Sequence, residues 1–266
     1  MSLTRQERRR QERKEKKKEK KIPRPTTEIN SRKSVEYEMN VKLLQPWSVP
    51  VLATKLPDPI LGKMLEISDE ILDDLNQQQS WGSNLAGQIK SEFLVPHEKL
   101  EEAGIMPFFV DSIRQFVIQC KCQMNPGQEK NIHAETWITQ LLSMWIVSQY
   151  PNEYNPMHLH TQCHISSVMY LKVPKFEPGI KSHRSDDDGS ILFVNSAGQD
   201  IDLCTPNFNI VPKVGDFFIF GAHQQHAVYP YRCSEGDPER RSISFNAIYQ
   251  SKTQYEENLQ NEKTNS

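Results

Sequence analysis

The chain has 266 residues, with 32 Lys+Arg and 34 Asp+Glu, which gives a formal net charge of -2 at pH 7. This length fits about one large domain or two small ones, because domains usually span roughly 100–200 residues. The near-neutral total conceals an asymmetry, since residues 1–24 contain 12 basic and 4 acidic side chains and the remaining 242 residues contain 20 and 30. The chain is therefore an acidic body that carries a basic N-terminal segment.

Composition argues against a membrane-spanning or exported protein. No apolar run approaches the roughly 18 residues that a transmembrane helix needs, and no apolar segment follows the basic N-terminus as in a signal peptide. The cysteines are odd in number and lack the paired spacing of a structural zinc site: Cys120, Cys122, Cys163, Cys204 and Cys233. We therefore expect a reduced, intracellular protein, located in the cytoplasm, or in the host cytoplasm if the source is viral.

The basic segment, residues 1–40, is of low complexity and has no apolar face to bury. Such composition is typical of a disordered tail. Two roles stay open for it, a solubilising spacer or an arm that makes weak contact with nucleic acid or another anionic surface. No aromatic residue lies between the charges, so base stacking has no support.

The first half of the folded region has extended and helical patterns. Extended, proline-punctuated apolar sequence occupies residues 43–57. Apolar residues then recur at helical spacing over 60–75 and again over 107–122, which predicts two amphipathic helices.

From Thr136 onward the sequence changes to short β-branched and aromatic segments separated by turn-rich sequence. These segments are WITQLLSMWIVSQY, HISSVMYLKV, SILFVN, NIVPKV, DFFIFGA and RRSISFNAIY. The pattern is typical of a β-sandwich or barrel. We predict one domain over residues 41–255, with helices first and a β-rich half after them, and a flexible C-terminus over 256–266.

Six of the eight histidines lie between positions 158 and 226. His158 and His160 are two residues apart, so on a strand both project from the same face. His226 follows the apolar strand DFFIFGA. Two imidazoles from one strand and one from a distant strand can form an open, three-ligand metal site.

The other histidines and one acidic cluster provide alternatives. We expect His97, His133 and His183 to be ordinary core or surface residues. His164 would lie about 13 Å beyond His160 on a regular strand, and His223 competes with His226. If His160 is not a ligand, the third position falls to a carboxylate of Asp186–Asp188 or to no protein group.

Four blocks of sequence, in order, resemble the 2-oxoglutarate/Fe(II)-dependent oxygenase superfamily: YPNEYNPMHLH, ISSVMYL, GDFFIFGAHQQHAVYP and RRSISFN. They are most similar to the prolyl-hydroxylase-like branch common in phage and marine bacteria. In that branch the metal strand reads H-x-H-x-x-x-H-[IL]-S-G-V-Y-Y-[LI] and the closing strand R-[IL]-S-[IL]-S-F-N. The resemblance covers residues 136–250 well. It implies an α+β fold, a double-stranded β-helix (jelly-roll barrel) with N-terminal flanking helices.

The resemblance also implies the metal ligands. His158 matches the first ligand of the family triad and His226 matches the distal histidine. His160 stands where most of the superfamily has a carboxylate, which lowers the ligand charge by one unit and implies a three-histidine Fe(II) site.

A dicarboxylate cosubstrate needs a fixed cation, for which the planar fork of arginine is well suited. On the strand RRSISFN, alternation places Arg240 on the polar face with Ser242, and Arg241 on the apolar face with Ile243. We expect Arg240 to bind the carboxylate, as the family motif also implies, and Arg241 to be a solvated edge charge. By the resemblance, Tyr170 hydrogen-bonds the same carboxylate.

The activity implied is hydroxylation of a C–H bond, coupled to conversion of 2-oxoglutarate and O2 into succinate and CO2. The cofactors implied are Fe(II) and 2-oxoglutarate, with ascorbate as a further candidate. A peptide side chain or a small molecule is the expected substrate, and peptidyl proline and a nucleobase are both left open. The alternatives are a cupin-like metal-binding or structural module without oxygenase activity, and an accessory factor recruited by the basic tail.

Overall fold

The computed structural model describes residues 50–177, 187–195 and 207–257. The predictions for the basic segment 1–40, for Cys204, for His183 and for residues 258–266 lie outside the described residues. The described part is an α+β structure with two antiparallel sheets, as the sequence predicted in its broad class.

Both predicted helices are present, and two short ones accompany them. The helices are α2 (Asp58–Asp73), α3 (His97–Glu102), α4 (Met106–Met124) and α5 (Glu129–Ala134), with a 3-10 turn at η1 (Gly82–Asn84). Proline in the first turn starts α2 and α4, because its missing N–H costs nothing there. None of the described helices is long and apolar enough to cross a membrane.

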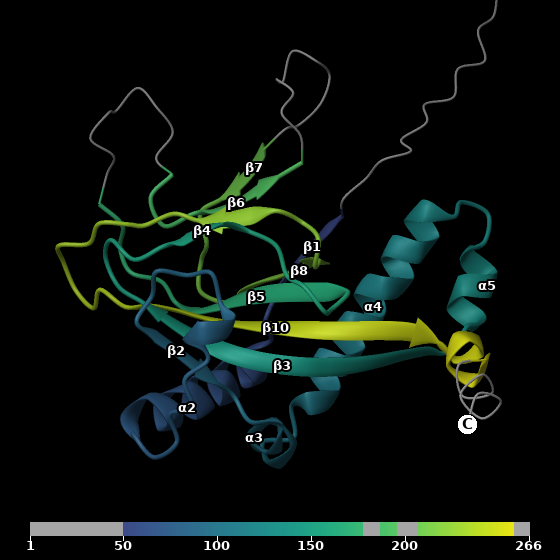
Figure 1. Cartoon of the computed structure of the whole chain (residues 1–266), viewed down its shortest axis with the longest axis horizontal. Helices are drawn as coiled ribbons and strands as arrows, with labels where there is room; N and C mark the ends of the chain where they lie inside the picture. The colour runs from purple at the N-terminus through teal and green to yellow at the C-terminus, as the bar shows by residue number, and fades with distance from the viewer. Residues whose placement is uncertain (1–49, 178–186, 196–206, 258–266) are drawn as a thin grey trace, which may run out of the picture. The chain divides into compact units, whose positions relative to one another are not determined.

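The strands form a six-stranded and a four-stranded sheet. The large sheet has the order β1 (Val51–Lys55), β8 (Asp216–Gly221), β5 (Ile165–Lys172), β10 (Arg240–Ser251), β3 (Trp137–Gln149), β2 (Ser91–Leu94). The small sheet has the order β4 (Asn155–His158), β9 (His226–Val228), β6 (Ile191–Val194), β7 (Asn207–Ile210). Figure 1 shows the small sheet on one side of the large sheet and α2 and α3 on the other.

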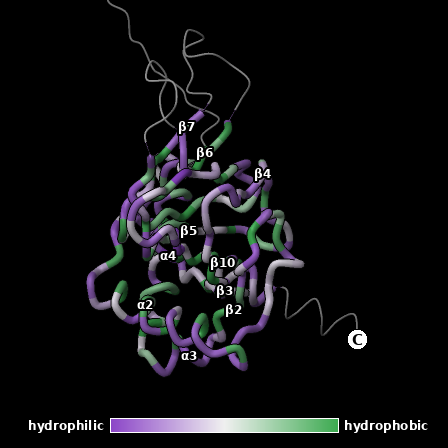
Figure 2. Tube along the Cα trace, turned by 90° about the vertical axis from the view of Figure 1, so that its left-hand side faces the viewer, coloured by the Kyte–Doolittle hydropathy of each residue, from purple (hydrophilic) through white to green (hydrophobic). Residues whose placement is uncertain are grey.

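Each central strand of the large sheet serves two apolar layers, because successive side chains point to opposite faces. On β8, Phe217 and Ile219 pack in the cluster that contains the buried faces of α2 and α4, whereas Phe218 and Phe220 pack in the cluster shared with the small sheet. In Figure 2 the hydrophobic segments gather around β3 and β10, and hydrophilic segments follow the outer loops.

The same alternation on β10 separates polar from apolar side chains. Ile243 and Phe245 are fully buried against the helices. Ser242 lies on the opposite face, in register with Val147 of β3 and Tyr170 of β5. The last strand thus presents a polar row to the space between the two sheets, as the sequence predicted.

Arg241 is not the solvated edge charge that the sequence led us to expect. Its side chain is 5% exposed and makes a two-pronged ion pair with Glu239, with N–O distances of 2.7 and 2.9 Å. It also donates to Ser68 and Asp69 of α2. The prediction was wrong because a helix more than 170 residues earlier in the chain covers this end of β10.

We expect Arg241→Met to destabilise the protein by about 2–3 kcal/mol, because the buried carboxylate of Glu239 loses its two-pronged partner and keeps only Lys172 and Ser148. Urea unfolding measures this change. The matched control is Arg114→Met, which removes an exposed pair with Asp111 and should cost about 0–1 kcal/mol. Equal effects of the two substitutions would contradict the buried role of Arg241.

Candidate functional site

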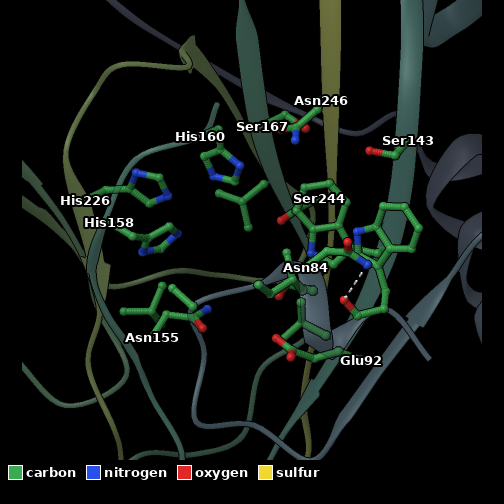
Figure 3. Close-up of a pocket in the computed structure, with 18 of the residues that line it drawn as sticks. Asn84, Glu92, Ser143, Asn155, His158, His160, Ser167, His226, Ser244 and Asn246 are labelled. Carbon is green, nitrogen blue, oxygen red and sulfur yellow. Dashed lines mark hydrogen bonds between the residues drawn. The ribbon is translucent and has the colours of Figure 1, made fainter. Parts of the chain in front are cut away.

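Three imidazoles meet at the end of the small sheet. His158 ends β4, His226 begins β9, and the two residues are paired across the strands. One ring nitrogen from each of His158, His160 and His226 lies within 4.8 Å of the others. Figure 3 shows the three rings together on one wall of a pocket. This spacing suits three nitrogen ligands around one metal ion.

Backbone carbonyls fix the orientation of two of these rings. Nδ1 of His158 lies 2.7 Å from the carbonyl oxygen of Pro156, and Nδ1 of His226 lies 2.9 Å from that of Gln224. Each Nδ1 therefore carries the proton and donates it to the carbonyl, which leaves each Nε2 as an available ligand atom. Metal-binding histidines usually have such a partner on their second nitrogen.

Burial keeps all three imidazoles neutral. It lowers the pKa of His158, lowers the pKa of His160 to about 4, and lowers the pKa of His226 to about 3. The neighbouring histidines lower the pKa of His160 and His226 further, because two protonated imidazoles would repel each other. Neutral imidazole is the form that binds a metal ion.

His160 reaches the cluster from outside a regular strand. The strand β4 ends at His158, and a register shift within it interrupts the pairing with β9. The backbone N–H of His160 instead donates to the carbonyl of Ala222 at 2.9 Å, and its ring stacks on that of His226 with an interplanar angle of 8°. The premise of a shared strand face was therefore wrong, although the two rings do meet.

The alternative ligands lie elsewhere. Nδ1 of His164 accepts a hydrogen bond from the backbone N–H of Tyr249, and His223 is exposed. Asp187 accepts a hydrogen bond from Asn209, Asp188 pairs with Arg232, and Asp186 lies outside the described residues. Among the described residues, only the three histidines form a group with the spacing of a metal site.

Arg240 supplies a buried positive charge to the same pocket. Its side chain is 2% exposed, and its two terminal nitrogens donate to the carbonyl of Gly189 and to the side-chain oxygen of Gln149. In the described part of the chain no carboxylate pairs with it. A buried charge without a counter-ion is costly, so its presence calls for an anionic ligand.

Two donors beside this charge have no partner. The Nε of Arg240 and the hydroxyl of Tyr170 are both buried without a hydrogen bond in the described structure, and the guanidinium carbon lies 5.9 Å from the centre of the Tyr170 ring. Burial raises the pKa of Tyr170 to about 12, so its hydroxyl keeps its proton. A carboxylate placed between them would accept both hydrogen bonds.

The histidines and Arg240 line one cavity of about 570 Å³ between the sheets. Ser242 and Tyr170, both predicted from the sequence, line it too. The sequence pattern did not point to Gln149, which accepts a hydrogen bond from Arg240, or to Glu92 of β2, which also lines the cavity. A usable signal for Gln149 was its position two residues after Val147, which places both side chains on the same face of a strand. The segment SEFL was too short to predict as a strand.

One comparison matches part of the chain to a protein family. Residues 143–246 match the family described as "Putative 2OG-Fe(II) oxygenase". This segment begins within β3 and ends within β10, so it includes the three histidines, Tyr170 and Arg240. A search of curated proteins found no match.

Three solved structures are similar to this chain at low identity. A Pseudomonas putida prolyl-4-hydroxylase is 18% identical, with a TM-score of 0.42, over 74% of this chain and 91% of that one. A Trichoplax adhaerens prolyl hydroxylase, in complex with a hypoxia inducible factor peptide fragment, is 14% identical, with a TM-score of 0.43. The match covers 75% of this chain and 83% of that one. A Burkholderia pseudomallei oxidoreductase of the 2OG-Fe(II) oxygenase family is 18% identical, with a TM-score of 0.30, over 41% and 43%, so the chain spans less than half of that protein.

We expect His158→Ala and His226→Ala each to abolish stoichiometric Fe(II) binding, because each removes one of three ligand nitrogens. His160→Ala should weaken Fe(II) binding by about tenfold or more. Loss of a group that merely hydrogen-bonds to a metal ligand already costs about 10–100-fold in metal affinity. Anaerobic titration with Fe(II) measures all three.

His223→Ala is the matched control, because His223 is exposed and outside the cluster. His160→Asp should keep metal binding, since it returns a carboxylate ligand to that position. Parent-like affinity of His160→Ala would refute the three-histidine site.

Proposed function

We propose that this chain, a member of the 2-oxoglutarate/Fe(II) oxygenase superfamily, is a dioxygenase that hydroxylates a C–H bond of a peptide side chain or a small molecule. Two features of the site support the proposal, the three-histidine cluster and the unpaired Arg240 in the same cavity. Together they provide a metal centre and a place for a dianionic cosubstrate.

His158, His160 and His226 would hold the metal. A metal held by only three protein ligands would have room for the cosubstrate and O2. Bound there with 2-oxoglutarate and O2, Fe(II) supplies the oxidising chemistry that inserts one oxygen atom into the substrate and the other into succinate, with release of CO2. A third imidazole in place of a carboxylate leaves the ligand set neutral, so the anionic cosubstrate supplies the negative charge near the ion.

Arg240, Tyr170 and Ser242 would hold the distal carboxylate of 2-oxoglutarate. Arg240 is already oriented by Gly189 and Gln149, so binding the anion costs little side-chain entropy. The hydroxyl of Tyr170 can donate the second hydrogen bond, and Ser242 lies in register beside Tyr170. The chain itself therefore binds and orients the cosubstrate.

The uncompensated charge of Arg240 is the observation that carries this proposal. A metal-binding or structural module without oxygenase activity would have no use for a buried guanidinium and an unpaired tyrosine hydroxyl beside an apolar wall. Replacing such groups by apolar residues is usually neutral or stabilising when no ligand needs them. The unpaired guanidinium and the unpaired tyrosine hydroxyl therefore favour a dicarboxylate-dependent enzyme over the metal-binding module.

The detailed fold and the domain bounds expected from the sequence belong to the same proposal. We interpret the two antiparallel sheets as a double-stranded β-helix within a domain over residues 41–255. Four further points stay predictions from the sequence alone. They are ascorbate as an accessory reductant, a phage source, a cytoplasmic location, and weak contact of residues 1–40 with nucleic acid.

We expect Arg240→Ala to weaken 2-oxoglutarate binding by about a hundredfold, because a buried charge-assisted pair is worth about 2–5 kcal/mol. Calorimetric titration of the Mn(II)-loaded protein measures this affinity without turnover. Arg241→Lys is the matched control, since Arg241 lies on the opposite face of β10 and a lysine keeps a positive charge beside Glu239, and it should leave the 2-oxoglutarate affinity within about twofold. Equal losses in the two variants would contradict the assignment of Arg240.

A further inference from the structure

A second charged group lines the cavity, and neither the metal nor the cosubstrate uses it. Glu92 of β2 is 2% exposed, and its Oε1 is buried without a hydrogen bond in the described structure. It is the one carboxylate among the described residues that line the cavity, and Arg240 is the one guanidinium. The histidine cluster does not include it.

Strand register places Glu92 far from the cosubstrate end. Glu92 pairs with Val147, Val147 with Ser242, and Ser242 with Tyr170. Three strand spacings of about 4.8 Å separate Glu92 from Tyr170, or about 14 Å in all. Figure 3 shows Glu92 apart from the three imidazoles, with Asn155 below His158. The carboxyl group of Glu92 therefore lies apart from the Tyr170 side of the cavity, and no ion pair joins it to Arg240.

Two glycines shape the space around the Glu92 carboxylate. A Cβ at Gly82 would lie 3.2 Å from Oε2, and a Cβ at Gly87 would lie 3.0 Å from Oε1 and overlap the side-chain oxygen of Asn155. The loop over residues 81–88 can approach Glu92 this closely only because both positions lack a side chain. The carboxylate is thus enclosed by backbone, although no donor of that backbone satisfies Oε1.

The electrostatic surroundings of Glu92 are unfavourable for a carboxylate. Burial raises the pKa of Glu92 to about 7, and the negative charge of Glu153 adds to the effect. No Lys or Arg of the described chain pairs with it. A ligand with hydrogen-bond donors and a positive charge would supply both the hydrogen bond and the counter-charge that Glu92 lacks.

We propose that Glu92 binds a cationic group of the prime substrate, a guanidinium or an ammonium, on the side of the cavity away from Tyr170. The inference rests on the proposed function, because it assigns the substrate end of the same site. Trp81 also lines this cavity, and its indole offers a face on which a cation can stack. The substrate class is therefore a basic side chain of a peptide or a free small amine.

The test uses the full-length chain loaded with Mn(II) and 2-oxoglutarate. The probes are Nα-acetyl-arginine methylamide, its neutral isostere Nα-acetyl-citrulline methylamide, Nα-acetyl-lysine methylamide and agmatine. We expect the arginine or lysine probe to bind at least about tenfold more tightly than the citrulline probe, because a hydrogen-bonded charge adds that much. Preferential binding of agmatine would identify a free amine in place of a peptide, and the shared cationic chemistry would stand.

Glu92→Gln keeps the shape of the side chain and removes its charge. It should therefore weaken the binding of the tightest cationic probe by about tenfold or more. Glu98→Gln makes the same change at an exposed position of α3 outside the cavity and should bind the probe like the parent. Titration with 2-oxoglutarate reports whether each variant is folded and loaded.

The outcomes separate the two proposals. If the parent protein does not bind 2-oxoglutarate, the proposed function fails. If it binds 2-oxoglutarate but the citrulline probe binds as well as the arginine and lysine probes, or if no cationic probe binds, the role of Glu92 is wrong while the function stands. Parent-like affinity of Glu92→Gln for the cationic probe would also overturn the inference.

Discussion

A buried guanidinium without a counter-ion is the constraint on which the rest of this site depends. Arg240 is held by Gly189 and Gln149, yet its Nε and the neighbouring Tyr170 hydroxyl have no partner in the described structure. The fold must therefore tolerate an uncompensated charge between its two sheets whenever the ligand is absent. Two polar acceptors, the carbonyl of Gly189 and the side-chain oxygen of Gln149, stabilise the charge and orient Arg240 in advance, which would reduce the entropy lost when the proposed anion binds.

The alternation of side chains along the large sheet lets one strand serve stability and chemistry at the same time. On β10, Arg241 binds α2 through Ser68 and Asp69, whereas Arg240, one residue earlier, faces the cavity. The two arginines are adjacent and both buried, but their partners differ completely. A one-residue shift in the register of β10 would exchange these roles, so the extensive pairing of β10 with β3 protects both the core and the site.

The sequence predicted what local periodicity encodes. Helical spacing located α2 and α4, and alternation in RRSISFN identified Arg240 as the inward-facing arginine. Burial of Arg241 escaped prediction because its partner Asp69 is 172 residues away. The path of His160 after β4 also depends on a distant contact, with the carbonyl of Ala222. Glu92 was missed because its importance comes only from the register of an edge strand with no clear pattern of its own.

The central claim, that Arg240 awaits the distal carboxylate of a dianion, is tested most directly by changing the ligand. Calorimetry on the Mn(II)-loaded protein should compare 2-oxoglutarate with 2-oxopentanoate, which has the same chain length and 2-oxo acid but lacks the distal carboxylate. The account predicts that 2-oxopentanoate binds about a hundredfold more weakly, because the guanidinium stays buried and unpaired. Equal affinities for the two ligands would contradict it.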